Sequence, residues 1–413
     1  MGYEQGLSGL AGASNALDVI GNNIANANTV GFKSSTAQFS DMYANSIATS
    51  VNTQIGIGTT LASVQQQFGQ GAINSTSSSL DVAINGNGFF QMSNNGVMTY
   101  TRDGTFQRDK NGYIVNAQGL NLMGYAADKN GVINTAQTVP LQAPTTNIAP
   151  TATTKITGQF NLNSQDSVPA KAPFDPSDNT TYNYSTSIQV YDSLGGSQPV
   201  NMYFVKSATS GQWEAYAGVQ GGSTTDLGTV TFDSTGAIQS TVASDGTATT
   251  SLGQFKFTID NSDGSGTPQP LTLDLTGTTQ YGGKDGVNNL AQDGFASGTL
   301  TTFTIGNDGK VTGNYSNGQT ATLGQIALAN FNNPNGLVNI GGNQYVETAA
   351  SGVPQISAPG STNHGTLQGS ALENSNVDLT SQLVNLITAQ RNYQANAQTI
   401  KTQQTVDQTL INL

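Results

Sequence analysis

The chain offers few side chains that could carry out catalysis. Its only histidine, His364, stands in the polar stretch Thr362–Thr366, between Asn, Gly and Thr residues. A Ser-His-Asp site would usually be accompanied by a Gly-x-Ser-x-Gly turn at the nucleophile, and the sequence contains no such turn. We therefore predict that His364 is a hydrogen-bonded loop residue and not a catalytic base.

Three other segments contain residues that can bind ligands. Residues 85–90 (NGNGFF) resemble the start of a dinucleotide loop, but the third glycine is missing and the flanks are of β type. Residues 260–266 (DNSDGSG) hold oxygen ligands like a calcium loop but lack the closing acid. Asp103 and Asp109 form a carboxylate pair of the kind that glycosidases use. We interpret all three as turns or turn caps, so no catalytic, cofactor-binding or metal-binding residue is predicted, and the protein is not expected to be an enzyme.

The composition narrows the choice of partner. Charged residues make up 9% of the chain, glycine occurs 49 times, and the formal net charge is -12. Nucleic-acid binding depends on clustered Lys and Arg, so a nucleic-acid partner is excluded. A nearly uncharged polar surface lets identical copies pack without repulsion, but a secreted β-rich protein has the same composition. Cysteine is absent, which excludes disulfides and thiolate chemistry.

The N-terminus MGYEQGLSGL lacks the basic and apolar regions of a secretory signal peptide. No apolar run approaches the roughly 20 residues that span a bilayer. We expect no membrane insertion, and either a cytoplasmic protein or export by a route without a cleaved signal.

The two ends of the chain have helical periodicity. Near the N-terminus, apolar residues alternate at spacings of three and four, which predicts a helix over residues 8–27 with a heptad seam. The seam residues are Leu10, Ala13, Leu17, Ile20 and Ile24. Asn26, Asn28 and Gly31 then supply turn formers beyond the helix end.

A second, longer seam lies near the C-terminus, over a helix predicted for residues 378–413. Its residues are Leu379, Leu383, Leu386, Gln390, Tyr393, Ala397 and Ile400. Ser375, three residues before Asp378, suggests a capping box at the helix start. After Ile400 the apolar pattern changes register, so the last turns are expected to fray or to face another neighbour.

Neither helix has enough apolar surface to fold alone. Fixing the backbone costs about 1 to 2 kcal/mol per residue over some 20 residues, and burying five large side chains returns only about 1.5 to 3 kcal/mol each. We predict that both termini are disordered in the isolated monomer and pair as a coiled coil only among neighbouring subunits.

Between the ends, the hydrophobic period changes from that of a helix to that of a strand. Alternating, β-branched segments are found at residues 80–84, 112–116, 187–191, 200–205, 254–259 and 300–305. Turn dipeptides separate them: Asn95-Gly96, Asn111-Gly112, Asn130-Gly131, Asp308-Gly309 and Asn317-Gly318. The predicted fold class is therefore mixed and mainly β, with all-β domains between N- and C-terminal helices.

Two shifts in composition, at residues 140–150 and 280–286, suggest domain boundaries. We expect a nested order, although a linear order of domains fits the same boundaries. The predicted parts are an inner helical domain (1–27 with 372–413), a linker region (28–70 with 364–371), a first β-domain (71–144 with 284–363) and an inserted outer β-domain (145–283).

Residues 22–33 (NNIANANTVGFK) resemble the N-terminal signature of the flagellar rod, hook and junction protein family. Residues 371–379 (ALENSNVDL) and 389–397 (AQRNYQANA) resemble its C-terminal signature. The signature residues are Asn22, Asn23, Asn26, Thr29, Gly31, Phe32, Lys33, Ser375, Asn376, Val377 and Asp378. Both ends agree in the right order, so chance is a poor explanation.

The resemblance extends to residues 80–90, 100–106 and 323–331, which are similar to the β-domain shared by rod and hook subunits. Rod subunits typically lack a large second β-domain, so the insertion favours a hook subunit, and residues 191–195 (YDSLG) also look hook-like. Flagellin is disfavoured because its terminal helices lack the NTVGFK string found here at residues 28–33. The alternatives that remain are a distal rod subunit and a secreted β-rich adhesin.

The resemblance implies a structural subunit that passes through the flagellar type III export apparatus and polymerises outside the cell under a hook cap protein. The product is a curved tube, a universal joint for motor torque, between the distal rod and the hook-filament junction protein. The two seams would form the polymerisation interface, and no cofactor is implied. Some relatives cross-link through a cysteine, a chemistry that this cysteine-free chain excludes.

Overall fold

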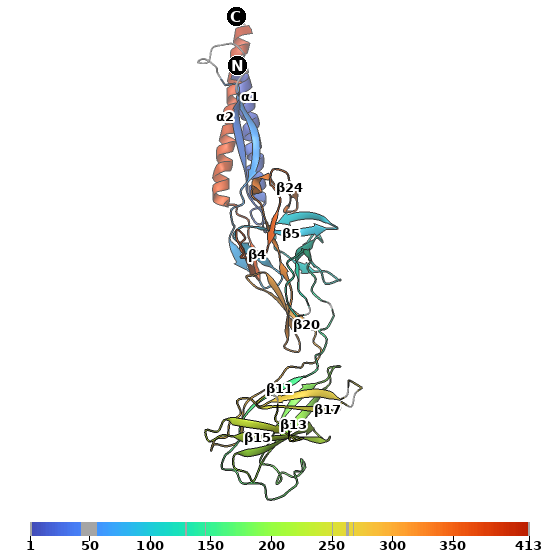
Figure 1. Ribbon diagram of the computed structural model, residues 1–413. Helices are drawn as coiled ribbons and strands as arrows, with labels where there is room; N and C mark the ends of the chain where they lie inside the picture. The colour runs from blue at the N-terminus through green and yellow to red at the C-terminus, as the bar shows by residue number, and fades with distance from the viewer. Residues whose placement is uncertain are drawn as a thin grey trace. The chain divides into compact units, whose positions relative to one another are not determined.

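The computed structural model describes residues 2–42, 56–128, 130–144, 146–249, 251–261, 264–266 and 268–411. The chain is mainly β with one helix near each end (Figure 1), which confirms the predicted fold class. It divides into two compact units. The first comprises residues 1–145, 301–314 and 320–413, and the second comprises residues 146–300 and 315–319. The second unit is thus inserted into the sequence of the first.

The two helices, α1 (Gly2–Ala25) and α2 (Leu379–Ile411), lie side by side and run antiparallel. Gly6 of α1 faces Ile400, and Asn23 Nδ2 lies 3.4 Å from Gln382 Oε1. Residues 412–413, the end of the predicted second helix, lie outside the described residues. Coiled-coil pairing among neighbouring subunits stays a prediction.

Helix α1 begins six residues earlier than the predicted start at Ser8, and it ends at Ala25 instead of Ala27. Glycines made the first turns look weak, but Gly6 and Gly9 are close-packing positions. A Cβ on Gly6 would lie 2.9 Å from Ile400, and one on Gly9 would lie 2.8 Å from Asn396. Tertiary packing therefore overrides the poor helix propensity of glycine. At the other end, Ala27 N–H turns back to Ile24 O, and the helix gives way to turns.

A β-hairpin lies within the segment predicted as a linker. Strands β1 (Ser35–Met42) and β2 (Gly58–Gln66) pair antiparallel and pack along α1. Gln5 Nε2 donates to Gly56 O at 2.8 Å, and a Cβ on Gly12 would lie 3.2 Å from Thr59. The linker residues 43–55 lie outside the described part of the chain.

The main sheet of the first unit has the order β20-β21-β22-β9-β5-β6-β25-β24, with β7, β8, β10, β23 and β26 joined beside this path. Two smaller pairs, β27-β4 and β28-β3, lie in the same unit. The bounds are β3 Ile73–Ser75, β4 Val82–Asn85, β5 Phe89–Asn94, β6 Val97–Thr101, β7 Gln107–Arg108, β8 Ile114–Val115, β9 Asn121–Ala126, β10 Val139–Pro140, β20 Leu300–Ile305, β21 Lys310–Tyr315, β22 Thr320–Ile326, β23 Leu328–Asn330, η1 Pro334–Gly336, β24 Val338–Gly341, β25 Gln344–Val346, β26 Gln355–Ser357, β27 Thr366–Gly369 and β28 Ala371–Glu373.

The second unit consists of two sheets, in the orders β17-β18-β11-β19 and β12-β13-β14-β15-β16. Their bounds are β11 Lys155–Asn161, β12 Tyr184–Tyr191, β13 Ser197–Lys206, β14 Gln212–Val219, β15 Thr224–Phe232, β16 Ile238–Ala243, β17 Gln254–Ile259, β18 Gln269–Asp274 and β19 Gly286–Gln292. Side chains from both sheets share one core around Trp213, Phe160 and Phe204. This unit extends to Leu300, past the expected boundary at residue 283, because β19 pairs with β11.

Four of the six predicted strand segments agree with the structure. Residues 254–259 and 300–305 are β17 and β20, and residues 187–191 and 200–205 lie inside β12 and β13. Residues 80–84 and 112–116 contain shorter strands than expected, β4 and β8. No helix among the described residues is long and apolar enough to cross a membrane.

Candidate functional site

The N-terminal and C-terminal signature segments meet in the first unit. Gly31 is in the left-handed region with φ +69°, and its N–H donates to Glu373 O at 2.8 Å. A Cβ on Gly31 would lie 2.6 Å from the backbone nitrogen of Asp103. Only glycine fits this position, because both the backbone conformation and the lack of space exclude other residues.

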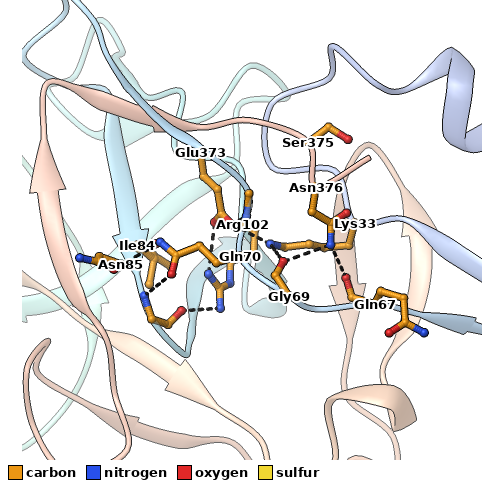
Figure 2. Close-up of polar contacts among 12 residues, drawn as sticks. Lys33, Gln67, Gly69, Gln70, Ile84, Asn85, Arg102, Glu373, Ser375 and Asn376 are labelled. Atoms are coloured by element: carbon orange, nitrogen blue, oxygen red, sulfur yellow. Dashed lines mark hydrogen bonds and ion pairs between the residues drawn. The ribbon is translucent and has the colours of Figure 1, made fainter. Parts of the chain in front are cut away.

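Two residues beyond Gly31, the chain places a lysine in the interior. Lys33 Nζ lies 2.7 Å from Glu373 Oε1, and Arg102 Nη1 lies 3.2 Å from Glu373 Oε2 (Figure 2). We call these three residues the junction cluster. Their side chains are 0 to 3% exposed. Glu373 comes from β28, Arg102 follows β6, and Lys33 precedes β1, so the cluster joins three distant parts of the sequence.

Other polar atoms of the junction cluster reach backbone groups of two glycine-rich turns, whereas the buried Arg102 Nε has no hydrogen-bond partner among the described residues. Lys33 Nζ also donates to Gly69 O at 2.8 Å, and Arg102 Nη2 donates to Gly86 O at 2.9 Å. Gly71 N–H donates to Glu373 Oε1 at 2.8 Å. Such hydrogen bonds are needed because unpaired polar atoms in a buried site are costly.

The cluster contains two cations and one anion. Burial lowers the pKa of Lys33, the nearby charge of Arg102 lowers it further, and Glu373 acts in the opposite direction. Burial likewise lowers the pKa of Arg102, and Glu373 raises it. Glu373 is therefore the only counter-charge within the cluster for both cations, so its loss would leave two buried charges uncompensated.

Asn376 joins the C-terminal signature to the N-terminal segment by three hydrogen bonds. Its Oδ1 accepts from Ser34 N–H at 2.8 Å, and its Nδ2 donates to Gln67 O at 2.7 Å and to Gly69 O at 3.1 Å (Figure 2). The Asn376 side-chain amide thus satisfies backbone N–H and C=O groups that would otherwise pair within a sheet.

The asparagines at the end of α1 also bond to the backbone. Asn23 Nδ2 donates to Ser35 O and Asn23 Oδ1 accepts from Ser35 N–H, both at 2.8 Å, which fixes the start of β1 against α1. Asn26 Nδ2 donates to Asn22 O at 3.0 Å. Thr29 Oγ1 donates to Asn26 Oδ1 at 3.1 Å, which stabilises the turn after the helix.

The predicted capping box at the start of α2 is wrong. Helix α2 begins at Leu379, and Asp378 is its cap: Oδ1 accepts from Thr380 N–H at 2.9 Å and Oδ2 accepts from Ser381 Oγ at 2.7 Å. Ser375 Oγ accepts from Val377 N–H at 3.3 Å, before the helix. The acid therefore caps the helix itself, and Ser375 shapes the preceding turn.

The two predicted seams are partly covered within one chain. Ala13 is buried, and Leu10, Leu17, Ile20, Ile24, Leu386, Ala397 and Ile400 are half-buried. Leu379, Leu383, Gln390 and Tyr393 are exposed. The side of α2 that faces α1 is formed by Gln382, Leu386 and Ala389, of which only Leu386 belongs to the predicted seam. Phe32 and Val377 are half-buried near the junction cluster. The role of the seams in polymerisation stays a prediction.

The residues that resembled ligand sites have structural roles. His364 Nε2 lies 2.9 Å from Gln355 O, and Nδ1 lies 3.0 Å from Ser357 Oγ, which confirms a hydrogen-bonded loop histidine. Residues 85–90 link β4 to β5. Within the described ranges, no group of three or more His, Cys, Asp or Glu side chains is placed to hold a metal ion.

The two loop acids are turn caps. Asp103 Oδ1 accepts from Thr105 N–H at 3.0 Å, and Asp109 Oδ1 accepts from Tyr113 N–H at 2.7 Å. In the calcium-like segment 260–266, residues 262 and 263 lie outside the described part of the chain.

Sequence reasoning did not assign Arg102 or Glu373, although both stand in quoted signature segments. With only 9% charged residues in the chain, both side chains are conspicuous, but no pattern in the sequence separates a buried, paired charge from the more common solvated one. The partners themselves could not be inferred, because Lys33 and Glu373 lie 340 positions apart.

Comparisons with known proteins match family models along most of the chain. Residues 5–33 match the flagella basal body rod protein model, and residues 83–158 match the flagellar hook protein FlgE/F/G D1 domain. Residues 161–295 match the flagellar basal body protein FlaE D2 domain, and residues 368–413 match the flagellar basal body rod FlgEFG protein C-terminal model. Together with the terminal helices and the inserted β-unit, these matches define a structural protein of the bacterial flagellum.

The similar proteins show which structural protein of the flagellum the chain resembles. The chain is 42% identical to the flagellar hook protein FlgE of Salmonella typhimurium, over 100% of both chains. It is 40% identical to that of Escherichia coli K12, again over 100% of both. The chain belongs to the flagellar hook protein FlgE family, and it is a structural component of the hook in the basal body-hook complex. A crystal structure of Helicobacter pylori FlgE2 matches with 16% identity and a TM-score of 0.48, covering 73% of this chain and 100% of that one.

Proposed function

We propose that this hook protein polymerises with copies of itself, through the helix pair α1 and α2, into a curved and flexible tube that transmits motor torque to the filament. The observation that carries the proposal is the set of apolar side chains left in water on the helix pair. Leu7 is 54% exposed, and Leu383, Val384 and Ile387 are 49 to 58% exposed. Contiguous exposed apolar side chains mark interaction sites on soluble proteins.

The division into two units supports different roles for the two parts. In the proposed tube, the helix pair forms the inner wall, the first β-unit surrounds it, and the inserted unit lies outside. A bending tube needs outer parts that slide past their neighbours. The scarcity of charges favours sliding, since few strong ion pairs can hold one register.

The proposed partners follow from hook membership. They are the distal rod below, the hook-filament junction protein above, the hook cap protein at the growing end, and the flagellar type III export apparatus. The chain would act outside the cell after export. We propose no enzymatic activity, no cofactor and no nucleic-acid partner for it.

Both terminal helices are proposed to be disordered in the isolated monomer. Helix α1 contains Gly2, Gly6, Gly9, Gly12 and Gly21, and a glycine costs about 1 kcal/mol relative to alanine in a helix interior. Amide hydrogen exchange on a verified monomer tests this. Fast exchange is expected across residues 10–24, and protection there in the monomer would contradict the proposal.

Electron microscopy of the purified full chain at rising concentration tests polymerisation. Curved tubes are the expected result. Straight tubes would instead favour a rod-like subunit, and a persistent monomer would contradict self-assembly.

A further inference from the structure

Helix α2 has an apolar face that its own chain leaves uncovered. Leu383 is 49% exposed, Val384 58% and Ile387 50%, whereas Gln382, Leu386 and Ala389 on the other side face α1. Leu383 and Ile387 are one helical turn apart, so they form a continuous ridge. One further turn along the same side stands Arg391, an exposed cation.

The outward face of α1 has the opposite character. Its exposed residues between positions 11 and 25 all have short side chains: Ala11, Asp18, Gly21, Asn22 and Ala25. A Cβ added to Gly21 would meet nothing within 4 Å. The packing of the single chain therefore gives no reason for a helix-breaking glycine at this exposed position.

The charges of the two helices are complementary. The charged residues of α1, Glu4 and Asp18, are both acidic. Arg391 lies about 6 Å along α2 from Ile387, and Asp18 lies about 4.5 Å along α1 from Gly21. In an antiparallel arrangement, Ile387 placed over Gly21 therefore brings Arg391 next to Asp18.

We infer that the α2 ridge of one copy packs against the short-side-chain face of α1 in a second copy, with Ile387 over Gly21, Leu383 over Ala25 and Arg391 beside Asp18. All subunits of a polar tube point the same way. Helix α2 of one copy therefore runs antiparallel to α1 of the next copy, as α2 and α1 do within one chain. The two faces differ, so the contact is heterologous, and in the proposed open tube it repeats from copy to copy without closing into a ring. This inference rests on the proposed self-assembly.

The first test fills the space on α1 in the full chain. Gly21→Leu introduces no clash within one chain, because a Cβ on Gly21 meets nothing within 4 Å, and the unfolding of the monomer's second unit, followed by Trp213 fluorescence in urea, should be unchanged. The critical concentration for tube formation, measured by light scattering and electron microscopy, should rise by about tenfold or more. Assembly of Gly21→Leu at the wild-type concentration would overturn the inference.

The second test exchanges charges. Asp18→Arg and Arg391→Asp should each raise the critical concentration, and the double variant should restore it to within about threefold of wild type. A double variant no better than the worse single variant would refute the pairing, as would single variants without effect. If the wild-type chain itself never assembles, the proposed self-assembly fails instead, so the two failures are distinguishable.

Discussion

Lys33 and Glu373 lie 340 positions apart in the sequence, and their charged atoms lie 2.7 Å apart in a fully buried site. The same carboxylate lies 3.2 Å from Arg102 Nη1. Charges removed from water lose their hydration, so a pair of this kind is maintained only where its geometry and hydrogen bonds are nearly complete. The junction cluster comes close to that condition, because Glu373 also accepts from Gly71 N–H, and Arg102 Nε is the one buried side-chain atom of the three residues that lacks a partner in the described part of the chain.

Glu373→Gln should destabilise the first unit by about 3 to 5 kcal/mol, because two buried cations lose their counter-charge. Urea unfolding followed by circular dichroism measures the loss. Trp213, the only tryptophan, lies in the core of the second unit, so its fluorescence should report an unchanged second unit. Lys33→Met in the same background should recover part of the loss, and simple additivity of the two changes would contradict the cluster as a coupled group.

Gly31→Ala should destabilise the first unit by several kcal/mol through two separate effects, about 1 to 2 kcal/mol from the left-handed backbone and the rest from the clash with Asp103. Gly119→Ala is the matched control, since Gly119 has φ +80° and open space around it. Its measured cost should be the backbone part alone. Equal costs at the two positions, in thermal unfolding, would argue against the close approach at Gly31.

Asp378→Ala should cost about 1 kcal/mol of helix stability, whereas Ser375→Ala should cost clearly less. The reason is that Asp378 accepts from the first-turn N–H groups of α2, and Ser375 bonds before the helix. Assembled tubes, where α2 is expected to be ordered, are the material for this comparison by thermal dissociation. A larger effect for Ser375→Ala would restore the capping-box interpretation.

Asp274 gives the second unit a pH-dependent stability. Burial by itself would raise the pKa of Asp274, but hydrogen bonds from Lys155, Thr276 and Gln254 lower it to about 2. The unfolded chain then binds more protons than the folded chain between the ordinary value of 3.8 and about 2. The contribution is therefore present above pH 3.8 and is lost as the pH falls toward 2.

Asp274→Asn should accordingly cost about 1 to 2 kcal/mol at neutral pH, after allowance for the half-exposed Lys155. The difference from wild type, measured by Trp213 fluorescence in urea, should shrink to nothing in acid. Lys171→Gln is the control in the same unit, because the Lys171 side chain is 65% exposed and its ion pair with Asp178 should contribute clearly less. A pH-independent difference for Asp274→Asn would contradict the assignment.

Leu17→Asp and Leu386→Asp should each prevent tube formation, because assembly would bury an unpaired charge. Both residues are half-buried on the facing sides of α1 and α2. Sedimentation of the variants under conditions where wild-type chains form tubes measures the effect. Normal tubes from either variant would exclude these positions from the polymer interface.

Local patterns predicted much of the fold. The strand β17, residues 254–259, alternates Phe and Ile with polar residues, and the structure buries its Phe255, Phe257 and Ile259. Asn95 takes the left-handed conformation that its Asn-Gly turn implied. In such segments the neighbours along the chain determine the conformation, so the sequence is sufficient.

Other features depend on contacts that no local pattern records. Gly6 and Gly9 weaken a helix in isolation, and only the approach of Ile400 and Asn396 explains their place in α1. The hairpin β1-β2 has few apolar side chains of its own and packs along α1. The junction cluster likewise requires three segments that only the complete fold brings together.

The order of residues in the junction cluster has a consequence for how the molecule is made. If the chain is delivered end first, as the proposed export implies, 340 further residues must follow the first of the two charged residues before the amine of Lys33 can meet the carboxylate of Glu373. The segment that contains the first of these two residues therefore stays without its ionic partner until nearly the whole chain has been delivered. A copy broken off before residue 373 lacks that carboxylate, so the amine of Lys33 and the guanidinium of Arg102 would have no ionic partner in the junction cluster.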